Sequence, residues 1–285
     1  MEYTIKAYAK INIALNVLGK LDNGYHEVDM VTLPIELHDI IELEPLPNGY
    51  ETYITSDDES LPTDESNLSI KAFMKLREKA NLSKNFMINI YKRIPMCAGL
   101  GGGSADAAAV INGALKLSKQ KVDSDKLLEI CANVGGDVAF CLYNKPARCR
   151  GIGEKLEFFE LKRKYHVLLI KPLIGVSTGE VYNDYDNFEP KEKFSDIDKL
   201  ILGLKTGNED LIAQEMKNSL QNPAIALVPE IKDIIEQLKN DGFKMTMMSG
   251  SGSTVFALAT DGHALLKESK KFDTNKYNVI LTTTL

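Results

Sequence analysis

Residues 95–109 read PMCAGLGGGSADAAA and lie between a segment with the pattern of a strand and a segment with the pattern of a helix. Four of these residues are glycines, Gly99 and Gly101 to Gly103. Because glycine lacks a Cβ, the chain can turn sharply here and bring bare N–H groups close to a ligand. Ser104 occupies the expected N-cap of the helix, and a helix N-terminus offers N–H donors and a positive dipole end. The stretch therefore predicts an anion site, most often a phosphate site.

The flanking residues give this stretch its place in the fold. Phe86, Ile88 and Ile90 alternate with other positions, as in a half-buried strand, and residues 104–118 repeat apolar side chains at helical spacing. The alternative is a tight strand-to-helix turn without a ligand, but one or two glycines would suffice for that. The spacing also differs from Walker A, which requires Lys and then Ser or Thr after its last glycine, and from the Rossmann fingerprint, which follows a first strand.

Length and composition indicate a soluble globular protein. The 285 residues suit one large domain or two of ordinary size, and 44% are hydrophobic and 26% charged. Lys and Arg total 34 against 40 for Asp and Glu, and no long basic run occurs, which argues against nucleic acid as a partner. No apolar run reaches membrane-spanning length, and the first ten residues lack the apolar core of a signal peptide, so we expect no membrane and a cytoplasmic location.

The cysteines do not form a metal or disulfide pattern. Cys97, Cys131, Cys141 and Cys149 show no CxxC pairing and no His at ligand spacing. We interpret them as reduced thiols, and no acidic cluster marks a metal cage, so the sequence assigns no metal ligand.

Two short segments carry polar residues that sequence alone leaves open. In residues 10–17, Lys10, Asn12 and Asn16 alternate with apolar residues, and we slightly favour a solvated face over a binding face. Asp137 follows two glycines and precedes an apolar run, and a helix cap and a functional carboxylate are about equally supported.

The remaining pattern mixes strands and helices, as in an α+β fold. A helix is expected from Asn67, with Leu68, Ala72, Met74 and Leu76 facing inward. The second half is expected to begin with a strand at 166–170 and a polar, aromatic loop containing Tyr182 and Tyr185. Further elements are expected as helices at 194–205, 208–220, 228–240 and 263–271, and as strands at 245–248, 255–259 and 277–283.

Three motifs, in this order, resemble those of the GHMP small-molecule kinases. They are YAKINIALNV at 8–17, PMCAGLGGGSADAAA at 95–109 and MSGSGSTVFAL at 248–258. Within that family the similarity is greatest to members that phosphorylate a cytidine-diphosphate-linked methylerythritol, because NGYHEV at 23–28 and GGDVAF at 135–140 are not general family features. The resemblance extends over the whole chain.

The resemblance implies a two-domain α+β GHMP kinase fold. Residues 1–160 would form an N-terminal ribosomal-protein-like α/β domain and residues 161–285 a C-terminal ferredoxin-like domain. The implied activity is ATP-dependent phosphorylation of the substrate's 2-hydroxyl in non-mevalonate isoprenoid precursor synthesis. ATP is then expected with Mg²⁺, which would be held mainly by ATP oxygens and water. The only expected partner is the small-molecule substrate. The protein itself is expected to be a monomer or a weak homodimer.

The resemblance also implies roles for individual residues. Lys10 and Asp137 fall on the family's catalytic pair, and Asn12, Tyr25, His26 and Tyr182 fall on substrate-binding positions. ATP-binding positions are Asn67, Pro95, Met96, Cys97, Ala98, Gly99, Leu100, Gly101, Gly102, Gly103, Ser104 and Ala105. The chemistry agrees, because Asp137 can accept the hydroxyl proton and Lys10 can offset charge on the transferring group.

Two rival functions remain at this point. One is another GHMP small-molecule kinase, such as one acting on homoserine, and the tyrosine and histidine after the first hairpin argue against it. The other is a nucleotide-binding regulator without catalysis. That function predicts loss of Lys10 or Asp137, and both are present.

Overall fold

The computed structural model describes residues 2–285 and divides them into two compact units. The first unit contains residues 2–9, 37–94 and 101–144, and the second contains residues 10–36, 95–100 and 145–285. The chain passes between the units several times, and two of these passages lie within the long strands β1 (Tyr3–Lys20) and β2 (His26–Pro45). This division follows packing and does not test the predicted domain boundary after residue 160, which stays a prediction.

The first unit contains a small sheet in which β4 is the middle strand of three. The C-terminal half of β2 pairs antiparallel with β4 (Phe86–Tyr91), placing Ile41 opposite Ile90. β4 in turn pairs parallel with β3 (Tyr53–Ser56). Because alternate residues of β4 are buried, the apolar face of this small sheet is available to helices.

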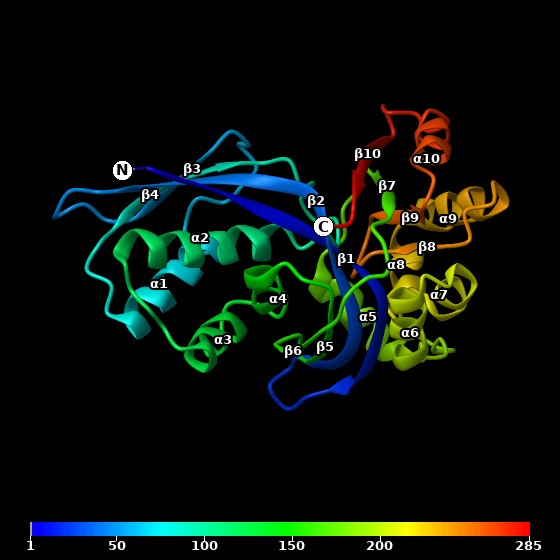
Figure 1. Ribbon diagram of the computed structural model, residues 1–285, viewed down its shortest axis with the longest axis horizontal. Coiled ribbons are helices and arrows are strands. Elements are labelled where there is room, and N and C mark those ends of the chain that lie inside the picture. The colour runs from blue at the N-terminus through cyan, green and yellow to red at the C-terminus, as the bar shows by residue number, and fades with distance from the viewer. Residues whose placement is uncertain (1) are drawn as a thin grey trace. The chain divides into compact units, whose positions relative to one another are not determined.

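Four helices complete the first unit: α1 (Leu68–Ala80), α2 (Gly102–Ser118), α3 (Ser124–Ala132) and α4 (Val138–Tyr143). α1 and α2 run beside each other below the strands (Figure 1). Small buried residues, among them Ala107, Ala108 and Gly113, let α2 pack closely against its neighbours. The α1 side chain of Phe73 meets Phe86 of β4 edge to face, with ring centroids 5.7 Å apart.

The second unit contains a hairpin and a separate four-stranded sheet. β5 (Ala147–Gly151) pairs with β6 (Lys155–Phe158) and with the N-terminal half of β2. The other sheet has the antiparallel order β10-β7-β9-β8. Its strands are β7 (His166–Pro172), β8 (Thr246–Met248), β9 (Val255–Ala259) and β10 (Tyr277–Thr283).

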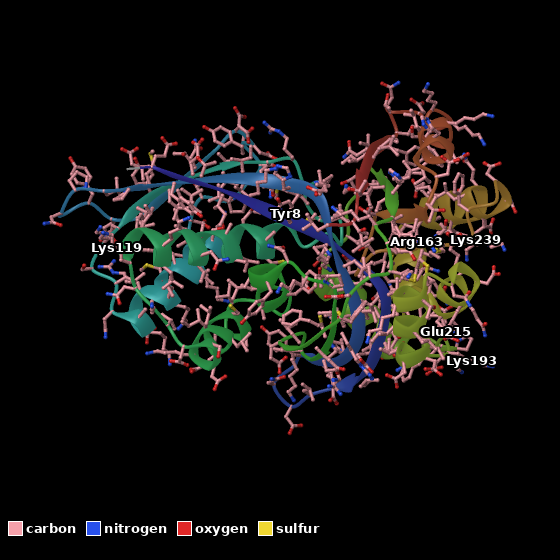
Figure 2. All side chains as sticks on the ribbon, viewed as in Figure 1. Tyr8, Lys119, Arg163, Lys193, Glu215 and Lys239 are labelled. Carbon is pink, nitrogen blue, oxygen red and sulfur yellow. The ribbon has the colours of Figure 1, made fainter. Side chains whose placement is uncertain are left out.

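Six helices belong to the second unit. They are α5 (Thr178–Asn187), α6 (Ile197–Thr206), α7 (Glu209–Glu215), α8 (Gln221–Leu227), α9 (Glu230–Asn240) and α10 (Gly262–Ser269). α9 is strongly amphipathic and buries Ile231, Ile234 and Leu238. Glu215, labelled in Figure 2, is buried at the end of α7, where its carboxylate accepts the backbone N–H of Asp196 at 2.9 Å. Among the helices of residues 2–285, none combines the length and apolar character needed to cross a membrane.

Several sequence predictions of local structure are wrong. Ser104 is not the N-cap of α2: Gly101 takes that position with φ +70°, which glycine adopts freely, so the helix starts earlier. The expected loop around Tyr182 and Tyr185 is helix α5, because Val181 and Tyr185 form a buried i, i+4 pair.

Two helix predictions also need correction. Met74 is 49% exposed, because it does not share the helical face formed by Ser69, Phe73 and Leu76. The single helix expected over 208–220 ends at Glu215, and the following α8 was not predicted.

Candidate functional site

The segments carrying the three family motifs meet at Ser249 in the second unit. Ser249 Oγ donates a hydrogen bond to the carbonyl oxygen of Gly99 at 3.0 Å, and the same hydroxyl accepts the N–H of Asn12 at 3.4 Å. The Lys10 N–H donates to the carbonyl oxygen of Leu100 at 3.0 Å. One serine thus joins β1, the residue 95–100 loop and the segment after β8.

The close approach of backbones at Gly99 requires a glycine. Its φ is +70°, and an ideal Cβ there would lie 2.1 Å from the backbone oxygen of Ser249. The facing Gly250 would place a Cβ 2.9 Å from the Gly99 oxygen and 3.2 Å from Lys10 Nζ. The glycines of two motifs therefore allow their backbones to pack directly against each other beside the lysine.

The polar face of β1 is buried, so the solvated face favoured from the sequence is wrong. Lys10 is 4% exposed and Asn12 is fully buried. Lys10 Nζ donates to Asn12 Oδ1 at 2.8 Å, and Asn12 Nδ2 donates to Thr32 Oγ1 at 3.0 Å. Thr32 on β2 thus fixes the amide orientation that presents an acceptor to the lysine. A buried, oriented ammonium is expensive to maintain and typical of a functional site.

The first turn of α2, Gly101 to Ser104, has the features of an anion site within the first unit. The N-cap residue, Gly101, has no side chain to cap this N-terminus, and the first turn contains no acidic residue. The early N–H groups of a helix lack internal partners, so these donors are available to an anion.

Two further site residues sit at helix starts. Asp137 occupies the N-cap position of α4, but its side chain makes no capping hydrogen bond, so the cap hypothesis is wrong for that carboxylate. Asn67 is the N-cap of α1: its Oδ1 accepts the N–H of Ser69 at 2.8 Å. Asn67 therefore has a structural role whatever it contributes to nucleotide binding.

Two of the residues expected to bind the substrate base, His26 and Tyr182, are in contact in the second unit. The His26 and Tyr182 rings have centroids 4.8 Å apart at a 33° tilt. His26 Nε2 lies 2.6 Å from Asp186 Oδ1, and Lys20 Nζ donates to Asp186 Oδ2 at 2.7 Å. The hydrogen bond from Lys20, followed by that from His26, lowers the pKa of Asp186. Asp186 therefore holds the imidazole in one orientation.

The two tyrosines of α5 play different parts. Tyr185 is 5% exposed, and its hydroxyl donates to the Val17 carbonyl at 3.0 Å, so it packs β1. Tyr182 is the one whose ring lies against His26. Tyr25, next to His26, is 53% exposed, and a base stacked on it would cover that ring.

Two family models match separate parts of this chain. The GHMP kinase N-terminal domain model matches residues 67–145, and the GHMP kinase C-terminal model matches residues 200–273. The 4-diphosphocytidyl-2-C-methyl-D-erythritol kinase of Clostridium botulinum (strain Alaska E43 / Type E3) is 38% identical over 288 residues, covering 99% of both chains. That of Clostridium beijerinckii is 40% identical, covering 95% of both. The chain belongs to the 4-diphosphocytidyl-2-C-methyl-D-erythritol kinase family.

Solved structures agree with this family and its GHMP kinase fold. A 4-(cytidine 5'-diphospho)-2C-methyl-D-erythritol kinase is 29% identical, with a TM-score of 0.79 and 99% of both chains covered. A homoserine kinase from Cytophaga hutchinsonii has a TM-score of 0.78 at 20% identity, which shows a shared fold alone. The predicted family and the predicted two-domain α+β GHMP fold are thus confirmed.

Sequence reasoning missed several residues of this family's candidate site. Ser249 lies in the motif at residues 248–258, but that motif by itself predicts no role for any of its side chains. Asn218 Nδ2 donates to the carbonyls of Met248 and Gly250, at 3.0 and 2.8 Å, and shapes the same segment. Asp186 carries no motif. Only the spacing of Tyr182 and Asp186, one helical turn apart, could have indicated that both face His26.

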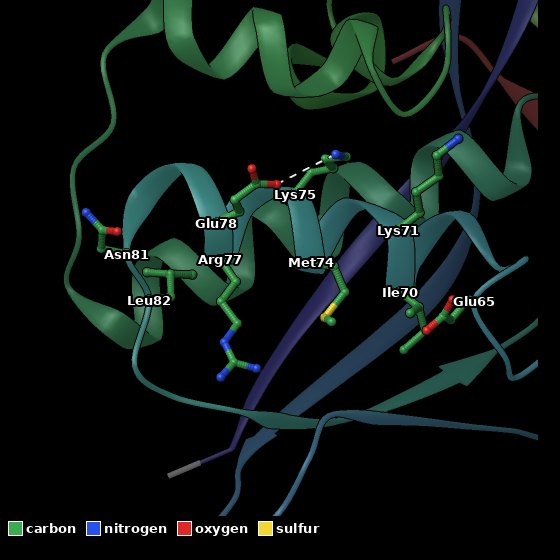
Figure 3. Close-up of a pocket in the computed structure, with 9 residues that line it drawn as sticks. All are labelled: Glu65, Ile70, Lys71, Met74, Lys75, Arg77, Glu78, Asn81 and Leu82. Atoms are coloured by element: carbon green, nitrogen blue, oxygen red, sulfur yellow. Dashed lines mark ion pairs between the residues drawn. The ribbon is translucent and has the colours of Figure 1, made fainter.

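A pocket of about 850 Å³ lies along α1 in the first unit. Figure 3 shows that its lining includes Met74, Arg77 and Leu82 from the helix and the turn after it. None of the residues lining this pocket is a candidate catalytic, ATP-binding or substrate-binding residue.

Cys97 offers a chemical probe of the glycine-rich loop. Its thiol is exposed, and the other three cysteines are buried. Because Cys97 precedes Gly99 by two residues, we expect a bulky maleimide to label Cys97 selectively and to inhibit ATP use. ATP should slow the labelling several-fold, measured by mass spectrometry of the Cys97 peptide. Equal rates with and without ATP would contradict a nucleotide at this loop, and Cys97→Ser provides the unlabelled control.

Proposed function

We propose that this chain transfers the γ-phosphoryl group of ATP to the 2-hydroxyl of 4-diphosphocytidyl-2-C-methyl-D-erythritol. The observation that carries the proposal is the meeting of the three kinase motifs at Ser249. This contact brings the loop backbone at Gly99 next to the buried Lys10. The family relationship supplies the acceptor, because the curated relatives carry the name of that kinase.

The proposed roles follow the chemistry of phosphoryl transfer, which depends mainly on positioning and charge stabilisation. Asp137 accepts the proton that the 2-hydroxyl loses as its oxygen forms the new bond to phosphorus, while the bond to the ADP oxygen breaks. Lys10 offsets negative charge on the transferring group. The N–H groups at the start of α2 hold the phosphates, with Asn67 and residues 95–105 around the nucleotide.

ATP is the phosphate donor of GHMP kinases, and Mg²⁺ is proposed to accompany it. Within residues 2–285, no group of three or more His, Cys, Asp or Glu side chains is arranged to hold a metal ion. The chain's own residues therefore do not fit a dedicated metal cage. Mg²⁺ held by phosphate oxygens and water would neutralise triphosphate charge. The cytoplasmic location and the monomeric or weakly dimeric state stay predictions.

The decisive experiment is an ADP-release assay with the cytidine-linked substrate. Homoserine serves as the matched acceptor for the rival kinase, and ATP alone gives the background hydrolysis rate. Release that requires the cytidine-linked substrate supports the proposal. Release only with homoserine, or with neither acceptor while ATP still binds, would replace it with one of the two rival functions.

Alanine substitutions at Tyr25 and Tyr182 test the substrate assignment. Stacking of a base on one aromatic ring contributes about 1–3 kcal/mol. Tyr25→Ala should therefore raise the KM for the cytidine-linked substrate by about 5- to 150-fold and leave the KM for ATP nearly unchanged. Tyr182→Ala should act in the same direction and also remove the ring that lies against His26.

The buried Tyr185 provides the contrasting control. Tyr185→Phe removes a hydroxyl that donates to Val17 and should lower the melting temperature without changing either KM. A Tyr25→Ala variant that loses stability but keeps its KM for the cytidine-linked substrate would show that Tyr25 is only structural.

A further inference from the structure

Three charged side chains are buried together in the first unit, and the proposed reaction does not use them. Lys92 Nζ donates to Asp39 Oδ2 and, at 2.9 Å, to Asp106 Oδ2. The Lys92 side chain is 6% exposed, that of Asp106 2%, and that of Asp39 fully buried. We call these three residues the buried charge cluster.

The buried charge cluster connects the elements that form the candidate phosphate site. Asp39, on β2, accepts the backbone N–H groups of Arg93 and Ile94, the residues leading into the glycine-rich loop. Asp106 lies in α2 itself. A Cβ on Gly102 would lie 3.1 Å from Ile94 Cγ2 and 3.4 Å from Lys92 Nζ. The first turn of α2 therefore rests directly on the lysine.

The charges in this cluster do not balance when every member is ionised. Two carboxylates and one ammonium leave a net buried charge of −1, and uncompensated buried charge is costly. Asp106 Oδ1 is buried and lacks a hydrogen-bond partner among residues 2–285. Burial raises the pKa of Asp106, Lys92 lowers it and Asp39 raises it, and together they bring it to about 7. Asp106 can therefore gain or lose a proton near neutral pH.

We propose that Asp106 is a positioning residue for ATP: through Lys92 it seats the first turn of α2 and sets the charge next to the phosphates. With Asp106 ionised, an additional negative charge lies near N–H donors that must meet a polyanion. With Asp106 neutral, Lys92 and Asp39 cancel, and the positive end of α2 acts unopposed. The identification of the anion as ATP rests on the proposed function.

The Asp106→Asn variant separates the charge of Asp106 from its contact with Lys92. Asn keeps the size of Asp and an oxygen that accepts from Lys92, but it cannot ionise. Between pH 6 and pH 8, the KM for ATP of the wild type should rise about 3- to 10-fold more than the KM of the variant. The kcat should change less than twofold. Titration of ATP itself cancels in this comparison. Asp125→Asn, at an exposed position of α3, is the matched control and should follow the wild type.

Thermal unfolding tests the cluster without using the kinase reaction. The pKa of Asp106 in the folded state lies above the unfolded value of 3.8. Between these two pH values, Asp106 therefore keeps its proton in the folded state and loses it in the unfolded state. The stability of the wild type relative to Asp106→Asn should therefore fall as pH rises from about 4 to 7 and level off above 7. Asp106→Leu, which fills similar space without a charge, replaces the Asn variant if that variant does not fold.

The outcomes separate this inference from the proposed function. If the chain does not phosphorylate the cytidine-linked substrate, calorimetric ATP affinity takes the place of KM, and the same pH difference supports the inference. Parallel pH profiles of ATP affinity for wild type and Asp106→Asn, with both proteins folded, would overturn it. So would a difference in melting temperature that does not change with pH.

Discussion

Asp137→Asn is expected to lower kcat with the cytidine-linked substrate by roughly 10²- to 10⁴-fold, the usual range for loss of a general base. Asn preserves the size of the side chain and its hydrogen bonding but cannot accept the hydroxyl proton. The Asp137 side chain does not cap α4, so the helix should not lose a cap. Steady-state kinetics and calorimetric titration with ATP measure the two parts of this prediction. Near-normal turnover would remove Asp137 from the mechanism.

Lys10→Ala extends this test to the proposed pair. Each single variant should lose rate, and the double variant should lose much less than the product of the two losses if they act as a unit. Because Lys10 is buried and bonded to Asn12, its removal also affects packing, so melting temperatures must accompany the rates. Asp125→Asn, an exposed carboxylate of the same unit as Asp137, should be indistinguishable from wild type in both assays.

Gly99→Ala should have the second large effect, because its methyl group would lie 2.1 Å from a backbone oxygen that cannot swing away. The left-handed backbone at +70° adds strain of about 1–3 kcal/mol for a non-glycine residue. We expect the melting temperature to fall by several degrees and kcat/KM for ATP to fall by roughly 10²-fold, since small displacements of a positioned site are costly.

Gly19→Ala is the matched control for that substitution. Gly19 lies in the same unit, and an added Cβ would have no atom within 4 Å. Its stability and ATP kinetics should equal those of the wild type. A Gly99→Ala protein with unchanged melting temperature and ATP kinetics would mean that the loop does not need the close approach to Ser249.

Much of the fold could be predicted because periodicity reports which side of an element is buried. The strands at 255–259 and 277–283 have the predicted bounds, since alternating or continuous apolar residues end there at polar turns. The glycine-rich loop could be predicted as a ligand site for a different reason. Four clustered glycines are too many for an ordinary turn, so their number itself indicated a ligand.

The errors arose where tertiary contacts override the local pattern. The sequence pattern of Lys10 and Asn12 is that of a solvated face. No pattern within β1 shows that Thr32 accepts from the Asn12 amide, whose oxygen in turn accepts from Lys10. Ser104 is a better N-cap residue than Gly101 by propensity, but the left-handed turn at Gly101 starts the helix. Chemical roles, such as that of Asp137, came from the family motifs and not from periodicity.

The partners of the buried side chains could not be read from the sequence at all. Asp39 lies 53 positions before Lys92, and Asp106 lies 14 positions after it, in a different element. Each alone resembles an ordinary surface charge. The same holds for Asp186, whose contact with His26 spans 160 positions. Such pairs follow only from topology, which brings these segments together after the local elements have formed.

The hydrogen bond from Ser249 to Gly99 also bears on how the enzyme is made. The two residues are 150 positions apart, and a ribosome adding 5–20 residues per second needs about 8 to 30 s to cover that interval. During this time the loop has been synthesised but lacks the serine that holds it. Truncated products ending before Ser249, the residue after β8, would carry the complete glycine-rich motif without that anchor. Competence to use the nucleotide is therefore acquired only after Ser249 has been synthesised.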